Sequence, residues 1–173
     1  MEDNILFISE KQFFNTKIDN KDRKILSALS ENARLSPTAL SKIIGLSKDS
    51  IAYRIKKLKE KNVLFEPVLI VNPWALGLHI HSIFVRVTNI KTEEEEKLIK
   101  CLVNNPFVMW CGLTGGEWDI GIQTVSSNIY HFDKILKEIK EKFGEKLLDI
   151  MVLEVIANYK YASLPDKYRK ENN

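Results

Sequence analysis

The chain has few cysteines and no long apolar run. Only two of its 173 residues are cysteines, Cys101 and Cys111, and neither belongs to a Cys-x-x-Cys pair. Isolated cysteines predict reduced, partly buried thiols rather than a disulfide framework. No stretch approaches the apolar length of a membrane span, and the acidic N-terminus has too short an apolar run for a signal peptide. We therefore expect a soluble cytoplasmic protein with no membrane partner.

The sequence also lacks the short motifs that mark common enzyme chemistries. It contains no glycine-rich phosphate loop, no Gly-x-Ser-x-Gly elbow and no dinucleotide fingerprint. His79 and His81 have a spacing that can bind a metal, but no cysteine or carboxylate lies nearby in sequence to complete a ligand set. We expect no catalytic residues, no metal and no cofactor, and a packing or interfacial role for the two histidines.

What the chain does have is an apolar fraction of 45%, enough for a packed core, and an uneven charge distribution. Residues 1–66 carry 13 Lys and Arg against 9 Asp and Glu, whereas residues 67–173 carry 13 against 14. The basic excess therefore lies in the first part. This distribution is expected when the first part meets phosphate groups and the rest has another role.

Three short helices are predicted within residues 16–66. Each has a capping residue before it and a stop after it: Asp19 and Asn32, Ser36 and Gly45, Ser47 and about Lys61. Their buried stripes follow from helical spacing: Ile25, Leu26 and Leu29; Leu40, Ile43 and Ile44; Ile51, Ile55 and Leu58. The turn Gly45-Leu46-Ser47 has the length and chemistry of a helix-turn-helix, since glycine tolerates a positive φ and leucine can pin the two helices.

The third helix is predicted to bury one side and to present the other to the major groove. Its first turns would contact base edges through Lys48, Asp49, Ser50 and Tyr53, after the Ser47 cap. Arg54 would meet either guanine or phosphate, and Lys57 and Lys61 would meet phosphate. Near the second helix, the DNA backbone would be held by Arg34, Ser36 and Thr38. The alternative is an ordinary basic surface helix in a protein-interaction module.

The remainder of the chain alternates between strand and helix periods. Strands are expected at 79–88, 107–113, 118–125 and 148–159, with Thr92 and Ser127 capping the two helices between them. This order is the β-α-β-β-α-β arrangement of ferredoxin-like domains, so the fold class is α+β. We predict five segments: an apolar N-terminal arm at 1–15, a winged helix-turn-helix domain at 16–66, a β hinge at 67–78, the βαββαβ domain at 79–162 and a tail at 163–173.

The motifs Asp22-Arg23-Lys24-Ile25-Leu26, Gly45-Leu46-Ser47 and Arg54-Ile55-Lys56-Lys57-Leu58 resemble the DNA-binding domain of the Lrp/AsnC (feast/famine) regulators. Thr114-Gly115-Gly116-Glu117-Trp118-Asp119 is similar to the glycine-rich turn of that family's effector and oligomerisation (RAM) domain. The resemblance covers about residues 16–162. It implies a transcription regulator that binds double-stranded DNA and dimerises through its second domain, often assembling further into octamers.

The resemblance also implies a small amino-acid-like effector bound near the turn. Carried over by position, the residues that would line or shape that site are Gly115, Gly116, Glu117, Trp118 and Asp119. Adjacent glycines can expose N–H groups to a carboxylate, and an acidic side chain can meet an ammonium group. The alternative interpretation of this segment is a tight β-hairpin with an exposed tryptophan.

Two other functions fit the same architecture. Sirohaem decarboxylases of haem biosynthesis look like Lrp/AsnC proteins, but they use basic and aromatic residues around the second strand. Here that strand reads Met109-Trp110-Cys111-Gly112-Leu113, without the expected His and Arg. The other alternative is an amino-acid-sensing module without DNA binding, against which the basic third helix argues.

Overall fold

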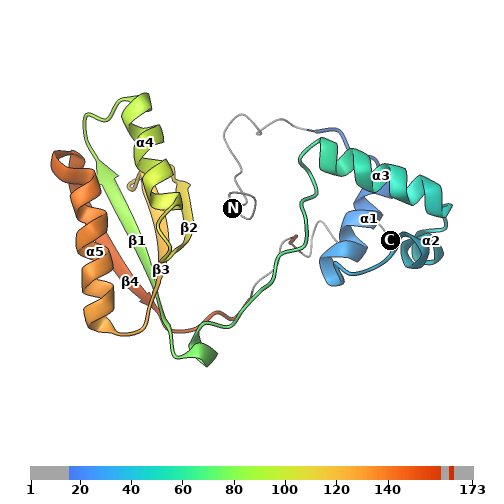
Figure 1. The fold of residues 1–173 in the computed structure, drawn as a ribbon. Coiled ribbons are helices and arrows are strands. Elements are labelled where there is room, and N and C mark those ends of the chain that lie inside the picture. Colours follow the sequence, from blue (N-terminus) through green and yellow to red (C-terminus); the bar gives the residue numbers. More distant parts are fainter. Residues whose placement is uncertain (1–15, 161–163, 166–173) are drawn as a thin grey trace. The chain divides into compact units, whose positions relative to one another are not determined.

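The computed structural model describes residues 16–160 and 164–165. They form two compact units that divide between Leu69 and Ile70. One unit holds three helices, and the other holds a four-stranded sheet with two helices (Figure 1). The predicted arm at 1–15 and almost all of the predicted tail lie outside the described residues.

The three helices of the first unit begin and end close to where the sequence predicts. They are α1 (Asn20–Glu31), α2 (Pro37–Ile44) and α3 (Lys48–Glu60). Their N-caps are confirmed, since each cap side chain accepts a backbone N–H: Asp19 from Asp22, Ser36 from Ala39 and Ser47 from Ser50. Because every helix start is capped within its own sequence, local chemistry alone sets where these helices begin.

A small apolar core holds the three helices together. Its fully buried members are Ile25, Leu40, Ile51 and Leu58, so the predicted stripes of α1 and α3 are confirmed. In α2 the prediction for Ile43 is wrong, because that side chain is 63% exposed. The short helix buries Leu40 and packs Ile44 against the core, and Ile43 is turned about 100° away from Ile44.

The segment between the two units contains no strand. Residues 65–72 have no regular structure, and a short 3₁₀ turn, η2 (Trp74–Leu76), follows. The predicted wing or β hinge is therefore wrong for the described part of the chain. Val68, Leu69 and Ile70 are exposed despite their strand-forming side chains. A strand requires a partner for its backbone groups, and local propensity does not supply one.

The second unit confirms the predicted β-α-β-β-α-β order. Its elements are β1 (His79–Val87), α4 (Thr92–Val103), β2 (Val108–Leu113), β3 (Ile120–Ser126), α5 (Ile129–Phe143), η3 (Gly144–Lys146) and β4 (Leu147–Val155). The strand order is β2-β3-β1-β4, and every neighbouring pair is antiparallel. Both helices cover one face of this sheet (Figure 1).

The core of this unit lies between the sheet and its helices. It is built from the inward residues of β1 and β3 and the buried faces of α4 and α5: Ile83, Val85, Leu98, Leu102, Ile120, Ile122, Phe132, Ile135, Ile139 and Phe143. Among the described residues, the opposite face of the sheet has no helix on it. It carries Phe84 and Met151, which are paired across β1 and β4, and half-exposed Trp110 and Leu153.

Several local predictions for this unit need correction. Lys91 and Asn128, rather than Thr92 and Ser127, occupy the N-cap positions. The Asn128 side-chain oxygen Oδ1 accepts the N–H of His131, so an amide cap one residue later replaces the serine. Cys101 is exposed, contrary to the prediction, because it lies on the outer side of α4, whereas Cys111 packs partly against the core.

Candidate nucleic-acid interface

The turn between α2 and α3 has the geometry expected of a helix-turn-helix. Gly45 ends α2 in the left-handed region with φ of 77°, a conformation that costs a side-chain-bearing residue energy. Leu46 packs against the core of the three-helix unit, and its carbonyl accepts the Ser41 hydroxyl. Three features therefore fix the turn: the left-handed Gly45, the packing of Leu46 and the Ser41–Leu46 hydrogen bond.

The α3 helix has one buried and one exposed side. Ile51 and Leu58 are buried, while Lys48, Asp49 and Tyr53 are exposed. This division places most of the predicted base-contacting side chains in solvent. Ser50 is only half exposed, and its backbone N–H is occupied by the Ser47 cap at 3.2 Å.

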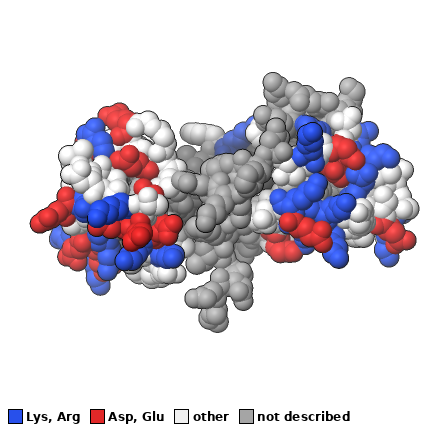
Figure 2. Space-filling view, turned by 90° about the horizontal axis from the view of Figure 1, so that it is seen from above, with Lys and Arg blue, Asp and Glu red and all other residues white. Residues whose placement is uncertain are grey.

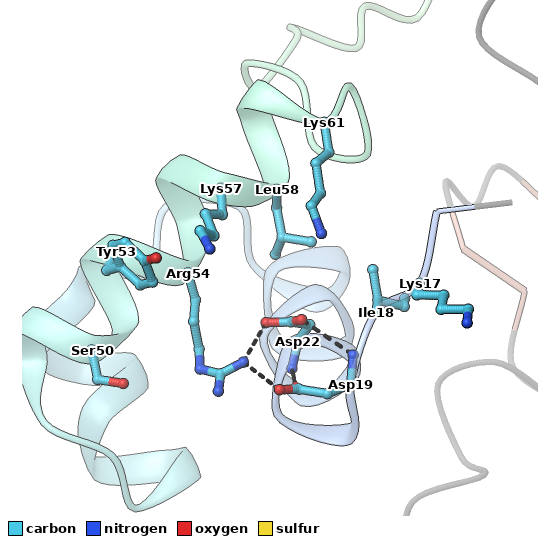
Figure 3. A pocket seen from close by; sticks show the side chains of 10 residues that line it. All are labelled: Lys17, Ile18, Asp19, Asp22, Ser50, Tyr53, Arg54, Lys57, Leu58 and Lys61. Atoms are coloured by element: carbon cyan, nitrogen blue, oxygen red, sulfur yellow. Dashed lines mark hydrogen bonds and ion pairs between the residues drawn. The ribbon is translucent and has the colours of Figure 1, made fainter. Parts of the chain in front are cut away.

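Tyr53 and Lys57 act as a pair on the exposed side of α3. The Lys57 ammonium lies 4.9 Å from the centre of the Tyr53 ring. Hydrogen bonding to the Tyr53 side chain raises the pKa of Lys57. Both side chains are exposed and close to the groove that lies beside α3 (Figure 3).

Arg54 does not point freely outward as predicted. Its Nη1 donates to Asp19 Oδ2 and to Asp22 Oδ1, both at 2.7 Å, and its side chain is only 23% exposed. The same two aspartates also cap α1 reciprocally, through Asp22 N–H to Asp19 Oδ1 at 2.8 Å and Asp19 N–H to Asp22 Oδ2 at 3.2 Å. Each carboxylate therefore uses one oxygen for the helix cap and the other for the guanidinium (Figure 3).

The electrostatics of this cluster favour its charged form. The Asp22 backbone N–H, followed by the Arg54 side chain, holds the pKa of Asp19 below its usual value. The two carboxylates in turn raise the pKa of Arg54. Sequence reasoning missed this contact because 32 and 35 residues separate the arginine from the acids. The sequence offered no clear signal for this contact, because Lys21 and Arg23 lie on the same helix turn as the two acids and are nearer candidate partners.

The predicted backbone contacts near α2 are exposed. Arg34, Ser36 and Thr38 all lie in solvent at the start of that helix. The Ser36 hydroxyl accepts the Ala39 N–H at 3.2 Å, and the Arg34 backbone N–H donates to the Asn32 side chain. Figure 2 shows Lys and Arg side chains grouped on the three-helix unit, whereas acidic and basic side chains intermingle over the sheet unit.

The second candidate site is the turn between β2 and β3. Gly115, Gly116 and Glu117 are exposed, and Gly116 has a φ of 114°. Asp119 is held within the fold, since its carboxylate accepts the Val87 N–H at 2.8 Å and its own N–H donates to the Val85 carbonyl. The Asp119 carboxylate therefore anchors the turn to the end of β1, and the three exposed residues form its open part.

Trp118 lies beside charged groups that the sequence did not single out. The Arg86 guanidinium carbon lies 5.8 Å from the centre of the Trp118 ring, and Arg86 Nη2 bonds Asp149 at 2.9 Å. These residues come from β1 and β4, two strands far apart in sequence. Only the sheet brings a cation, an anion and an aromatic ring together next to the turn.

The two histidines of β1 lie in different environments. His79 bonds Glu154 through Nδ1 at 2.9 Å at the exposed end of the strand. His81 is buried and stacks on Phe132 with ring centres 3.6 Å apart, and burial lowers its pKa. Among residues 16–160, 164 and 165 no group of three or more metal-ligating side chains is found, and none of the helices there is long and apolar enough to cross a membrane.

Together these features define a class: a helix-turn-helix protein whose second unit is a ferredoxin-like α+β domain. Comparisons with known proteins agree. The AsnC-type helix-turn-helix domain matches residues 18–59. The proline dehydrogenase transcriptional activator of Rhodobacter capsulatus is 31% identical over 143 residues, which cover 82% of this chain and 88% of that protein. The transcriptional regulator LrpA of Pyrococcus abyssi is 33% identical over 136 residues, covering 78% and 83%.

Solved structures share the fold over both units. An AsnC family regulator from Agrobacterium tumefaciens superposes with a TM-score of 0.74 at 25% identity, covering 87% of this chain and 99% of that one. A regulator from Neisseria meningitidis, solved as a complex with L-Met, superposes with a TM-score of 0.73 at 24% identity, covering 86% and 97%. The chain belongs to the Lrp/AsnC family of transcriptional regulators.

Proposed function

We propose that this regulator recognises its operator through α3, as a homodimer whose DNA binding responds to a small amino-acid-like effector. The observation that carries the proposal is the two-sided character of α3. Ile51 and Leu58 fix its inner side, while Lys48, Asp49 and Tyr53 stand in solvent on the other. A capped helix start with exposed polar and charged side chains is what major-groove recognition requires.

The division of roles along α3 follows from its direction. In helix-turn-helix proteins the first turns of the recognition helix contact base edges. Lys48, Asp49 and Tyr53 therefore supply direct readout, and Lys57 supplies a phosphate contact farther along. Arg34 and Thr38 are placed to hold the backbone near α2. Arg54 does not contact bases in this proposal, because it is already paired with Asp19 and Asp22 within the three-helix unit.

Dimerisation through the sheet is supported by the helix-free face. Phe84, Met151 and Leu153 lie on that face, and Trp110 covers Gly112 and Gly121 beside them. An apolar sheet face of this kind is stabilised when a second copy covers it. A dimer presents two α3 helices, so we expect a pseudo-palindromic operator with half-sites about one DNA turn apart.

An amino-acid effector is supported by the glycine turn and by the regulator solved with L-Met. Gly115 and Gly116 leave backbone N–H groups open to a carboxylate, and Glu117 can meet an ammonium group. Trp118 forms the apolar wall of this site, and Asp119 fixes the turn to β1. Assembly of dimers around the turn, up to an octamer, would bring the residues of neighbouring dimers to the same ligand.

The test is selection of DNA fragments by the full chain, with and without a panel of amino acids. Recovery of a pseudo-palindromic sequence, with a yield that changes with one amino acid, is the expected result. Affinity for the recovered duplex should fall as salt rises, because phosphate contacts release counterions. If no duplex is enriched, or if affinity is independent of salt, the proposal is wrong. A visible absorption spectrum on adding sirohaem would favour the decarboxylase alternative instead.

A further inference from the structure

A half-open groove lies where the start of α1 meets α3, within the three-helix unit (Figure 3). Its volume is about 530 Å³. Ile18 and Leu58 form its apolar floor, and the Arg54 cluster closes one side. Three lysines also line it: Lys57 lies in α3, Lys61 is the C-cap of α3, and Lys17 lies in the segment before α1.

The charges of this groove are divided between two parts. Arg54 is paired with Asp19 and Asp22. The cluster therefore carries a formal charge of minus one and does not attract an anion. All three lysines are exposed, and they make the groove as a whole positive. Among residues 16–160, 164 and 165, Lys17 and Lys61 form no ion pair, and the Lys57 ammonium lies over the neutral Tyr53 ring.

The position of the groove along α3 favours the DNA backbone as its ligand. If the first turns of α3 enter the major groove, the later turns run along its edge, where the sugar–phosphate backbone passes. Lys57 and the C-cap Lys61 are about one helical turn apart at this end of α3, and both line the groove. Lys17 lines the same groove from a segment 40 residues earlier, so its ammonium extends the basic track beyond the recognition helix.

We propose that this groove is a seat for DNA backbone phosphates, in which Lys17 joins Lys57 and Lys61 while Arg54 serves only to hold α1 against α3. The inference rests on the proposed DNA-binding function. It adds a contact from outside the helix-turn-helix, and it assigns Arg54 to positioning rather than to recognition. Phosphate contacts carry no base information, so Lys17 should strengthen binding to every duplex by a similar factor.

The experiment compares full-length Lys17→Ala with Lys24→Ala and the unchanged protein. Lys24 is also an exposed lysine near the start of α1, but it lies two residues beyond Asp22 and so faces about 200° away from the Arg54 cluster. Affinity is measured by fluorescence anisotropy at several salt concentrations, using the duplex recovered by selection and a scrambled duplex of equal length. Circular dichroism of each variant checks that the helices are intact.

Lys17→Ala should reduce the slope of log affinity against log salt by about one and weaken both duplexes by the same factor. Lys24→Ala should leave the slope unchanged. The inference is overturned if Lys17→Ala keeps the slope of the unchanged protein, if it weakens only the selected duplex, or if Lys24→Ala has an equal effect. Failure of the unchanged protein to bind either duplex would instead refute the proposed function, so the two failures are distinguishable.

Discussion

Removing the Arg54 guanidinium should destabilise the three-helix unit rather than abolish base recognition. In Arg54→Ala two hydrogen bonds of 2.7 Å to carboxylates are lost. Asp22 is left with a side chain only 17% exposed, whereas Asp19 is 53% exposed and water compensates it. Charge-assisted bonds of this kind contribute about 1.5–3 kcal/mol when buried and about 0–1 kcal/mol at the surface, so we expect a loss of about 1–2 kcal/mol.

The chain offers a convenient way to measure this loss in one unit at a time. All three tryptophans, Trp74, Trp110 and Trp118, lie after residue 69, so the three-helix unit contains none. In a denaturant titration of Arg54→Ala, the helical circular dichroism should gain an earlier transition while the tryptophan fluorescence transition stays in place. Asp22→Asn tests the same contact from the other partner, and the double variant measures the coupling between them.

The effect should also depend on pH in a defined direction. The pKa of Asp19 is lowered in the folded chain, so its ion pair contributes fully above the unfolded pKa of about 3.9 and is lost as pH falls through the lower folded value. The difference between Arg54→Ala and the unchanged chain should therefore shrink in acid. If Arg54→Ala unfolds like the unchanged chain and loses only its preference for the selected duplex, the positioning role is refuted and Arg54 reads DNA.

Three further predictions concern the sheet unit. Asp119→Ala removes the acceptor of a backbone N–H at the end of β1 and should cost about 1–3 kcal/mol in the tryptophan-detected transition; unchanged stability with an altered effector response would show that the carboxylate serves the ligand instead. Gly121→Ala places a Cβ 2.8 Å from the Trp110 ring, so the ring must shift. Its fluorescence should change, and so should the mass measured by sedimentation if the proposed dimer forms through this face. A thiol reagent at neutral pH should label exposed Cys101 quickly and Cys111 slowly, because burial raises the pKa of Cys111 to about 11; equal rates would contradict this.

The helix-turn-helix could be predicted in detail because its signals are local. The caps at Ser36 and Ser47 and the left-handed Gly45 act within a few residues of their own positions, so one sequence contains all the information needed. The ferredoxin-like order was predictable for a similar reason. The spacing of apolar residues distinguishes each strand from each helix, and short connections leave few ways to pair the strands.

The errors share a physical cause, since each depends on partners that are distant in sequence or absent from it. Val68 to Ile70 have strand-forming side chains, but no neighbouring strand is present among the described residues to complete a ladder. Arg54 has the spacing of an outward residue on α3, yet two acids at the start of α1 hold it. Local spacing places a side chain on a face of its helix, but it does not say what stands opposite.

The sequence by itself determined the element types, their order, the turn at Gly45 and the family, because these follow from capping, periodicity and motif chemistry. Only the tertiary structure decided which charged side chains remain open to a ligand. It paired Arg54 with two carboxylates, turned Asp119 inward to a backbone N–H and placed Lys17 on the groove that Lys57 and Lys61 also line. The reason is that the free energy of a charge depends on its neighbours in space, and folding selects those neighbours from the whole chain.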